Sequence, residues 1–245
     1  MKNIVTIRPL AIEKELHEIN GELTHLLEGK LYARKGVFHY KIGRKEIGIT
    51  KQPNLIRQLC RRAYLQARKS QLENNLYQPV AKNDNRTPRQ LIAELPNAYQ
   101  SVPEEYFYHA KVENFLAKPP RFNTLNPEQE KYLHNGIKYR SLSEREIAVK
   151  QTANNLLFYY DARFNLGFAE ISADFYIMNP FTGKYFLWEF FGAFNKPNYG
   201  AHMNDKMAHY RQINFVEHDN LIVTFEHHLR DTTIIQELID NIIWS

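Results

Sequence analysis

The sequence predicts an α/β protein built in two parts, on three observations. Segments with helical and with strand-like apolar spacing follow one another over residues 132–245, and mostly helical patterns fill residues 1–131. The charge also changes along the chain. Residues 1–131 contain 22 Lys and Arg against 14 Asp and Glu, a net charge of +8, whereas residues 132–245 contain 10 against 13, a net charge of −3. We therefore expect a domain boundary between residues 131 and 132.

The composition excludes several classes of protein. With 43% hydrophobic and 24% charged residues, the chain has enough apolar side chains for a packed core, so it is neither disordered throughout nor fibrous. Cys60 is the single cysteine, which excludes an intrachain disulfide and favours a reducing, cytoplasmic setting. The most apolar stretch, residues 185–194, is shorter than the ~20 residues of a membrane span. No apolar leader precedes a cleavage site, so we expect no membrane association.

The front part is expected to combine helices with a small β-meander. Apolar residues recur at helical spacing over residues 11–28, and Gly29 is suited to end this helix. Short alternating segments with glycine turns follow, which is typical of antiparallel strands. The expected strands are residues 31–34, 37–42 and 46–49, and the expected later helices are residues 53–76, 88–95 and 104–116.

The long helix expected over residues 53–76 carries a cluster of positive charges. Its cations are Arg57, Arg61, Arg62, Arg68 and Lys69. Positive charge attracts phosphates without reading bases, so these side chains are candidates for a DNA-binding ridge. The alternative is an ordinary helix face with solvated cations. The net positive charge of residues 1–131 favours a polyanionic partner. Carboxylates in residues 132–245 could hold a metal ion.

The back part has the order helix, three strands, helix, strand, helix. Ser141 or Ser143 can cap the first helix, and the sequence NPFTG at residues 179–183 predicts a turn between the second and third strands. The helices are expected over residues 142–157, 199–212 and 232–243, and the strands over residues 156–160, 171–178, 184–190 and 220–225.

Two carboxylates are expected to meet across the hairpin. If the turn is centred between Phe181 and Thr182, counting outward in both directions pairs Asp174 with Glu189. Paired side chains share a face, with Cβ atoms ~4.5–5.5 Å apart. Two carboxylates this close repel unless a positive group lies between them, and Mg²⁺ prefers such oxygen ligands. The alternatives are an arginine paired with one carboxylate or an asymmetric turn.

Apolar neighbours and two further charges distinguish this pair of carboxylates. Asp174 and Glu189 each stand in an apolar strand, where an unpaired charge is costly and where carboxylates with shifted pKa values mark functional sites. Glu144 lies in the first turn of the preceding helix, a position that the helix dipole also favours. Lys206 lies on the helix after the hairpin and shares a face with Tyr210.

A helix Glu, a strand Asp, a strand Glu and a nearby Lys, in this order, resemble the PD-(D/E)xK nuclease superfamily. The motifs are GIKYRSLSE at residues 136–144, ADF at 173–175, FLWEFFG at 186–192, and Tyr199, Lys206 and Tyr210 with spacings of seven and four. They are more closely similar to those of a group of largely uncharacterised bacterial proteins with this domain. The similarity spans about residues 136–226, and the front part also resembles this group.

The resemblance implies a restriction-endonuclease-like core and metal-dependent hydrolysis of phosphodiester bonds, with DNA as the expected substrate. It implies that Glu144, Asp174 and Glu189 hold one or two Mg²⁺ or Mn²⁺ ions, and that Lys206 orients water or stabilises developing charge. Substrate binding is expected of four motif residues, Lys138, Arg140, Ser141 and Tyr210. A role in defence or in a mobile element is common for such nucleases, and a homo-oligomer or a larger complex is then expected.

Two departures from the superfamily pattern leave a second function open. Phe191 stands where the superfamily usually keeps its lysine, and in the resembling group the lysine comes from the following helix, so Lys206 inherits the role. Phe190 replaces the usual histidine after the glutamate. The alternative to an active nuclease is therefore an inactive nuclease scaffold that binds nucleic acid or another protein.

Overall fold

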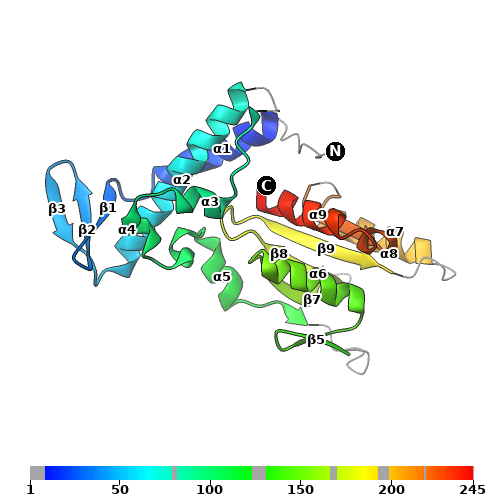
Figure 1. The fold of residues 1–245 in the computed structure, drawn as a ribbon. Coiled ribbons are helices and arrows are strands. Elements are labelled where there is room, and N and C mark those ends of the chain that lie inside the picture. The colour runs from blue at the N-terminus through cyan, green and yellow to red at the C-terminus, as the bar shows by residue number, and fades with distance from the viewer. Residues whose placement is uncertain are drawn as a thin grey trace. The chain divides into compact units, whose positions relative to one another are not determined.

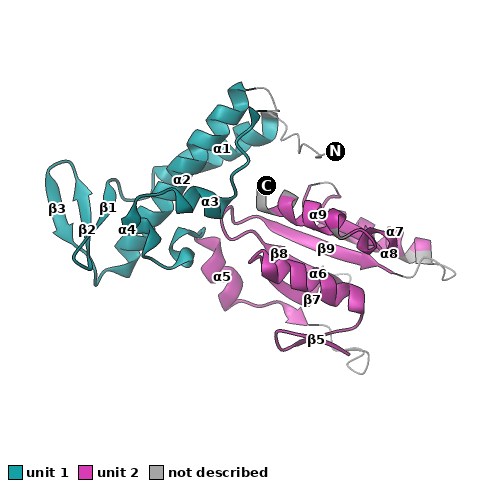
Figure 2. Ribbon diagram, viewed as in Figure 1, with its two compact units in different colours: residues 1–109 teal, residues 110–245 magenta. Residues whose placement is uncertain are grey.

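The chain forms two compact units, residues 1–109 and residues 110–245 (Figure 2). Helices and strands occur in both units, which confirms the predicted mixed α/β class. The computed structural model describes residues 9–78, 82–122, 131–165, 170–192, 199–217 and 219–244. Among these residues, no helix combines the length and the apolar character that crossing a membrane requires.

The first unit contains two long helices and a small sheet (Figure 1). Its elements are α1 Pro9–Leu23, β1 Lys30–Arg34, β2 Val37–Ile42, β3 Lys45–Gly48, α2 Pro53–Tyr77, α3 Pro88–Ala93, α4 Asn97–Gln100 and a 3-10 helix, Glu104–Phe107. β1, β2 and β3 pair antiparallel in chain order, as the meander pattern predicts. α2 begins at Pro53, whose fixed φ and missing N–H suit the first turn of a helix.

The second unit is a five-stranded sheet with helices on both faces (Figure 1). Its elements are α5 Lys111–Ala117, β4 Arg121–Phe122, β5 Tyr132–His134, β6 Ile137–Tyr139, α6 Leu142–Ala153, β7 Leu157–Asn165, β8 Glu170–Met178, β9 Tyr185–Phe191, α7 Tyr199–Gln212, β10 Leu221–Phe225, α8 Glu226–Leu229 and α9 Thr232–Trp244. The strand order is β10-β9-β8-β7-β4, and β10 runs parallel to β9 whereas the other neighbours are antiparallel.

Two apolar clusters separate the sheet from its helices. On one face, Ile147 of α6 and Ile239 of α9 are buried with Trp188 of β9. On the other face, Met207 and Tyr210 of α7 are buried against the same sheet. Both faces of β8 and β9 are therefore covered, which explains their nearly continuous apolar sequences.

The order predicted for the back part is present as α6, β7, β8, β9, α7, β10 and α9, with the short α8 added. The helix expected over residues 142–157 ends at Ala153, because Asn155 adopts a left-handed φ of 54° that turns the chain into β7. The β5–β6 hairpin lies outside the predicted elements. Its turn, Asn135-Gly136, has φ values of 47° and 78°, the positive values for which an Asn-Gly pair is suited.

The boundary between the units lies earlier in the chain than predicted. β4 pairs with β7, and the Tyr159 hydroxyl donates to the Phe115 carbonyl of α5 at 3.0 Å. The Phe115 ring also packs on Tyr159, with ring centroids 4.7 Å apart. α5 and β4 therefore belong to the second unit, and the chain divides between residues 109 and 110 rather than 131 and 132. The helix expected over residues 104–116 is accordingly split into the 3-10 helix and α5.

Candidate functional site

The β8–β9 hairpin has the register that the position of its turn predicts. Phe175 pairs with Trp188, so one further step brings Asp174 beside Glu189. The Asp174 backbone N–H donates to Glu189 Oε1 at 3.3 Å. The turn itself is held by Asn179, whose side-chain oxygen accepts hydrogen bonds from two backbone N–H groups. Local turn chemistry thus brings the two acids together.

Glu189 is buried, with 1% of its surface exposed, and both of its oxygens accept hydrogen bonds. Lys206 Nζ lies 2.7 Å from Oε2, and the Tyr210 hydroxyl donates to Oε1. Both donors come from α7, where residues four apart share a face. Phe191 is buried in the apolar cluster beneath α7, and the lysine that contacts Glu189 comes from α7.

Asp174 is held between the β9 backbone and an arginine. Its Oδ2 accepts from the Phe190 N–H at 2.8 Å, and its Oδ1 lies 3.2 Å from Nη2 of Arg140. The same nitrogen lies 3.3 Å from Asp161 Oδ1, so Arg140 bridges two carboxylates. An arginine on one carboxylate, which the sequence left open as an alternative, is therefore present together with the expected contact with Glu189.

Glu144 has both a structural contact and a contact with the site. It forms a capping box with Ser141: the Ser141 hydroxyl accepts from the Glu144 N–H at 3.1 Å, and Glu144 Oε2 accepts from the Ser141 N–H at 3.3 Å. The Tyr160 hydroxyl donates to the same Glu144 oxygen at 2.6 Å. Tyr160 also accepts from the backbone N–H of Arg140 at 3.0 Å, which connects the start of α6 to the strand acids.

The cluster holds more negative than positive charge. Its four carboxylates and two cations are those of Glu144, Asp161, Asp174, Glu189, Arg140 and Lys206. Burial and repulsion from Asp174 raise the pKa of Glu189 to about 7, although Lys206 and Tyr210 act in the other direction. Burial and Asp174 also raise the pKa of Glu144. In the described part of the chain, four carboxylates thus share two cations, which favours the protonated form of Glu144 and Glu189.

The donors of this cluster suit a hard divalent cation in type and in charge, because Mg²⁺ prefers carboxylate oxygens. Among the described residues, however, no three Asp, Glu, His or Cys side chains are grouped so that they could hold a metal ion. Both oxygens of Asp174 are engaged, one by the Phe190 N–H and one by Arg140. A cation at Asp174 would take the place of Arg140.

The residues expected to bind substrate do not all reach the cluster. Arg140 and Tyr210 contact its carboxylates directly, and Ser141 joins it through the capping box. Lys138 is exposed on β6, and no hydrogen bond or ion pair is found for it within the described part of the chain. The structure therefore groups three of these four residues.

Two residues of the cluster, Tyr160 and Asp161, are not predicted from the sequence, and Asp161 adds a fourth carboxylate. It is buried, with 4% of its surface exposed, and lies in β7 between two residues that pair regularly with β8, Tyr160 and Ala162. Its φ of 53° is left-handed, an uncommon conformation for a residue with a side chain and one that clusters at functional sites. An acid between an aromatic and an apolar residue in a strand is the signal that Asp174 and Glu189 share.

The prediction that α2 presents a ridge of DNA-binding cations is wrong for Arg61 and Arg68. Arg61 donates to both oxygens of Glu22 at 2.7 and 2.8 Å, and Arg68 donates to both oxygens of Glu15 at 2.8 and 3.0 Å. Only 5% and 3% of these two arginines are exposed. Both side chains join α2 to α1 and face away from solvent.

The other three cations of α2 are also engaged within the first unit. Arg62 donates to the carbonyls at the end of α1 and beyond it, at 2.9 and 3.1 Å, and Lys69 donates to Asn20 at 2.7 Å. The Arg57 guanidinium lies 4.9 Å from the centre of the Tyr106 ring. α2 is therefore a packing helix rather than a free basic surface.

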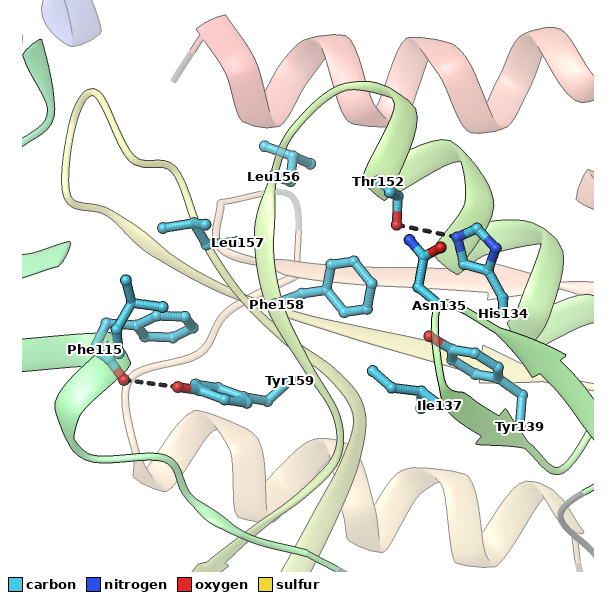
Figure 3. A pocket seen from close by; sticks show the side chains of 11 residues that line it. Phe115, His134, Asn135, Ile137, Tyr139, Thr152, Leu156, Leu157, Phe158 and Tyr159 are labelled. Atoms are coloured by element: carbon cyan, nitrogen blue, oxygen red, sulfur yellow. Dashed lines mark hydrogen bonds between the residues drawn. The ribbon is translucent and has the colours of Figure 1, made fainter. Parts of the chain in front are cut away.

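A separate pocket of about 250 Å³ lies between α5, the β5–β6 hairpin and the start of β7 (Figure 3). Aromatic residues, including Phe115, Phe158 and Tyr159, form much of its wall, and no Asp or Glu lines it. Tyr139 belongs to this wall, and the next residue, Arg140, belongs to the carboxylate cluster. No residue that lines this pocket belongs to the carboxylate cluster, so the two are distinct features.

Comparison with known proteins found no match to this chain among protein-family models, curated proteins or solved structures. The functional assignment therefore rests on the residues of the cluster and on their contacts.

Proposed function

We propose that the chain is a metal-dependent nuclease that hydrolyses phosphodiester bonds in DNA, with Mg²⁺ or Mn²⁺ as its metal. One observation carries this proposal. Glu144, Asp174, Glu189 and Lys206 come from α6, β8, β9 and α7, and their side chains lie in one cluster, linked directly or through Tyr160 and Arg140. Residues far apart in sequence gather around an excess of buried carboxylate. Burying unpaired charge costs free energy, and carboxylates with shifted pKa values cluster at functional sites.

The fold of the second unit supports this reading. A helix precedes three antiparallel strands, a second helix follows them, and a parallel strand then joins the sheet. The four residues occupy the elements that the resemblance to the PD-(D/E)xK superfamily implies. A restriction-endonuclease-like core is therefore part of the proposal.

The chemistry divides between a metal and the side chains. Glu144, Asp174 and Glu189 would hold the metal, which when bound supplies Lewis-acid stabilisation of the attacked phosphate and of the water that attacks it. Lys206 keeps its proton, because Glu189 and Asp174 raise its pKa although burial acts to lower it. With 21% of its side chain exposed, the ammonium can meet a phosphate oxygen on which charge develops, or orient the water.

The second candidate, a nucleic-acid-binding or protein-binding module without catalysis, is favoured by the contacts of Asp174. Both of its oxygens have protein donors, so the site is neutralised in part without any metal. In this case Arg140 is a permanent counter-ion, and Asp174 never exchanges it.

A cleavage panel separates these two functions. Single- and double-stranded DNA and RNA are incubated with the purified chain in Mg²⁺, in Mn²⁺ and in EDTA, and binding is measured in parallel by gel shift. The proposal expects metal-dependent cleavage of DNA that Asp174→Asn abolishes and that Arg211→Ala, at an exposed cation of α7, leaves unchanged. Binding without cleavage in either metal would establish the second candidate instead.

A further inference from the structure

The β1–β2–β3 meander of the first unit carries exposed cations, unlike α2, whose cations are engaged within the unit. From residue 30 to residue 51 there are seven Lys and Arg and a single acid, Glu46. All seven cations are exposed: Lys30, Arg34, Lys35, Lys41, Arg44, Lys45 and Lys51. Among the described residues of the first unit, Lys14 and Lys82 are the other exposed cations, so most of its exposed positive charge lies on and beside this small sheet and not on α2.

The register of the strands collects three of these cations on one face. Lys30 pairs with Lys41, Tyr32 with His39 and Arg34 with Val37, so these side chains project to the same side of the sheet. Leu31, between Lys30 and Tyr32, points to the opposite side of the sheet, and Ile49 directly follows β3. Both residues are buried and hold the meander against the rest of the first unit. We call the side that carries Lys30, Tyr32, Arg34 and Lys41 the basic face.

A pair of like charges marks the basic face as a surface for a polyanion. Lys30 and Lys41 are direct cross-strand partners, and like charges in this position destabilise a sheet. Glu46 pairs with Lys41 on β3, but it also lies 3.4 Å from His39, and no acid is paired with Lys30 or Arg34 in the described register. A row of phosphates would turn this repulsion into attraction.

Tyr32 adds a contact that suits a nucleic acid. Tyr32 is 45% exposed, and Lys41 Nζ lies 5.3 Å from the centre of its ring. Exposed aromatic rings between cations provide stacking surfaces for bases beside contacts for phosphates. Both turns of the meander are also basic, through Lys35 and Arg44, which extends the positive surface beyond the strands.

We propose that the basic face binds the phosphate backbone of a nucleic acid, through charge and stacking and without reading its sequence. The choice of nucleic acid as the polyanion rests on the proposed function, whereas the affinity for a polyanion rests on the face itself. The surface is a separate element from the carboxylate cluster, so binding persists when cleavage is prevented.

The test compares two sets of cations in the full chain. One variant carries Lys30→Gln, Arg34→Gln and Lys41→Gln, and the control carries Lys118→Gln, Arg121→Gln and Arg211→Gln, three exposed cations of the second unit. Affinity for single- and double-stranded DNA is measured by fluorescence anisotropy in EDTA over a range of salt. The basic-face variant is expected to bind about 10-fold more weakly or worse, and its salt slope is expected to fall by ~2–3, about one for each lost phosphate contact.

Thermal unfolding separates lost binding from lost folding. Because Lys30 and Lys41 repel each other, the basic-face variant is expected to keep or raise its Tm while it loses DNA. Lys41→Gln alone serves as a second variant. It is also expected to bind DNA more weakly than wild type, with a salt slope about one unit smaller than that of wild type. Anionic lipid vesicles replace DNA in a parallel titration.

Three results would overturn the proposal. They are an unchanged affinity and salt slope in the basic-face variant, an equal loss in the control variant, and a loss confined to vesicles. The proposed function fails by a different result, absence of metal-dependent cleavage in a chain that still binds DNA through the basic face. The two failures are therefore distinguishable.

Discussion

Two sets of buried charges in this molecule differ in whether each carboxylate has a cation of its own. Between α1 and α2, Arg61 faces Glu22 and Arg68 faces Glu15, each arginine on both oxygens of one acid. In the second unit, four carboxylates share Arg140 and Lys206. The first set is balanced and joins two helices, whereas the second retains negative charge at the centre of a sheet.

The titration of the acids follows the same division. Burial acts to raise the pKa of Glu22, but the hydrogen bond and the charge of Arg61 outweigh it, so the pKa is lowered. At Glu189, burial and Asp174 outweigh Lys206 and Tyr210, and the pKa is raised to about 7. Glu189 is also more buried than Glu22, with 1% against 26% of its side chain exposed, so burial and the shortage of cations together raise its pKa and mark a candidate functional site.

The largest effect is expected where a matched pair is broken. Arg68→Ala leaves Glu15 buried without its partner and is expected to lower the free energy of unfolding by about 3–5 kcal/mol. Replacing both residues by methionine is expected to restore most of this stability, because an apolar pair of similar size needs no ion pair. Urea denaturation measures both. A loss in Arg68→Ala no larger than that of an exposed substitution would show that the pair is not structural.

The next effect is on turnover at the unmatched cluster. Lys206→Ala removes a donor aimed at Glu189 and, by proposal, at the phosphate, so cleavage is expected to slow by ~10²-fold or more. Arg211→Ala on the same helix is the control, and DNA affinity is expected to remain near that of wild type in both variants. Single-turnover cleavage of labelled DNA measures the rates. Near wild-type rates in Lys206→Ala would leave the lysine without a catalytic role.

A tenfold effect is expected at Arg140. If Arg140 and a divalent cation compete for Asp174 Oδ1, Arg140→Gln is expected to bind Mn²⁺ about 10-fold more tightly than wild type, close to 1.4 kcal/mol. Arg145→Gln, at a neighbouring cation of α6 that pairs with Glu146, is the control. Calorimetric titration without DNA measures the affinity. Equal affinities in the two variants would contradict competition and favour a permanent counter-ion.

How much of this can be predicted from the sequence differs between the two sets. The β8–β9 register follows from one turn and a period of two, so the sequence alone is enough to pair Asp174 with Glu189. Helical spacing predicts only that Lys206 and Tyr210 share a face of α7, whereas the expectation that Lys206 belongs to the site comes from the resemblance to the nuclease superfamily. Asp161 cannot be placed in this way, because its left-handed φ interrupts the regular pairing of β7 with β8.

The matched set is harder to predict, because a helical pattern shows one helix and not its partner. Arg61 and Arg68 are seven residues apart, and so are Glu15 and Glu22 on α1. Equal spacings of opposite charge on two amphipathic helices are the signal that these helices face each other. The predicted domain boundary is wrong for a related reason, since α5 and β4 join the sheet through pairing that local sequence does not show.

The smallest effect is on the pH dependence of stability, and its sign differs between the sets. Glu189 binds a proton more tightly folded than unfolded, so it stabilises the fold at low pH, and this contribution is lost as pH rises from near 4.5 to about 7. Glu22 has a lowered pKa, so its contribution is present at neutral pH and is lost as pH falls.

Glu189→Gln and Glu22→Gln test these signs in thermal unfolding from pH 4 to pH 8. The Tm of wild type is expected to fall, relative to Glu189→Gln, by a few degrees as pH rises over that range. Relative to Glu22→Gln, the Tm of wild type is expected to rise with pH. The same slope in both comparisons would remove the distinction between matched and unmatched acids.

The most direct test of the central claim is the stabilisation of the free chain by a divalent cation. If the excess carboxylates of the second unit form a metal site, Mg²⁺ or Mn²⁺ at ~100 times its dissociation constant is expected to stabilise wild type by about 2.7 kcal/mol, seen as a rise in Tm. Asp174→Asn is expected to lose this rise, and a Glu15 and Arg68 double methionine variant is expected to keep it. A wild-type Tm that responds to neither metal, or a rise of equal size in Asp174→Asn, would contradict the claim.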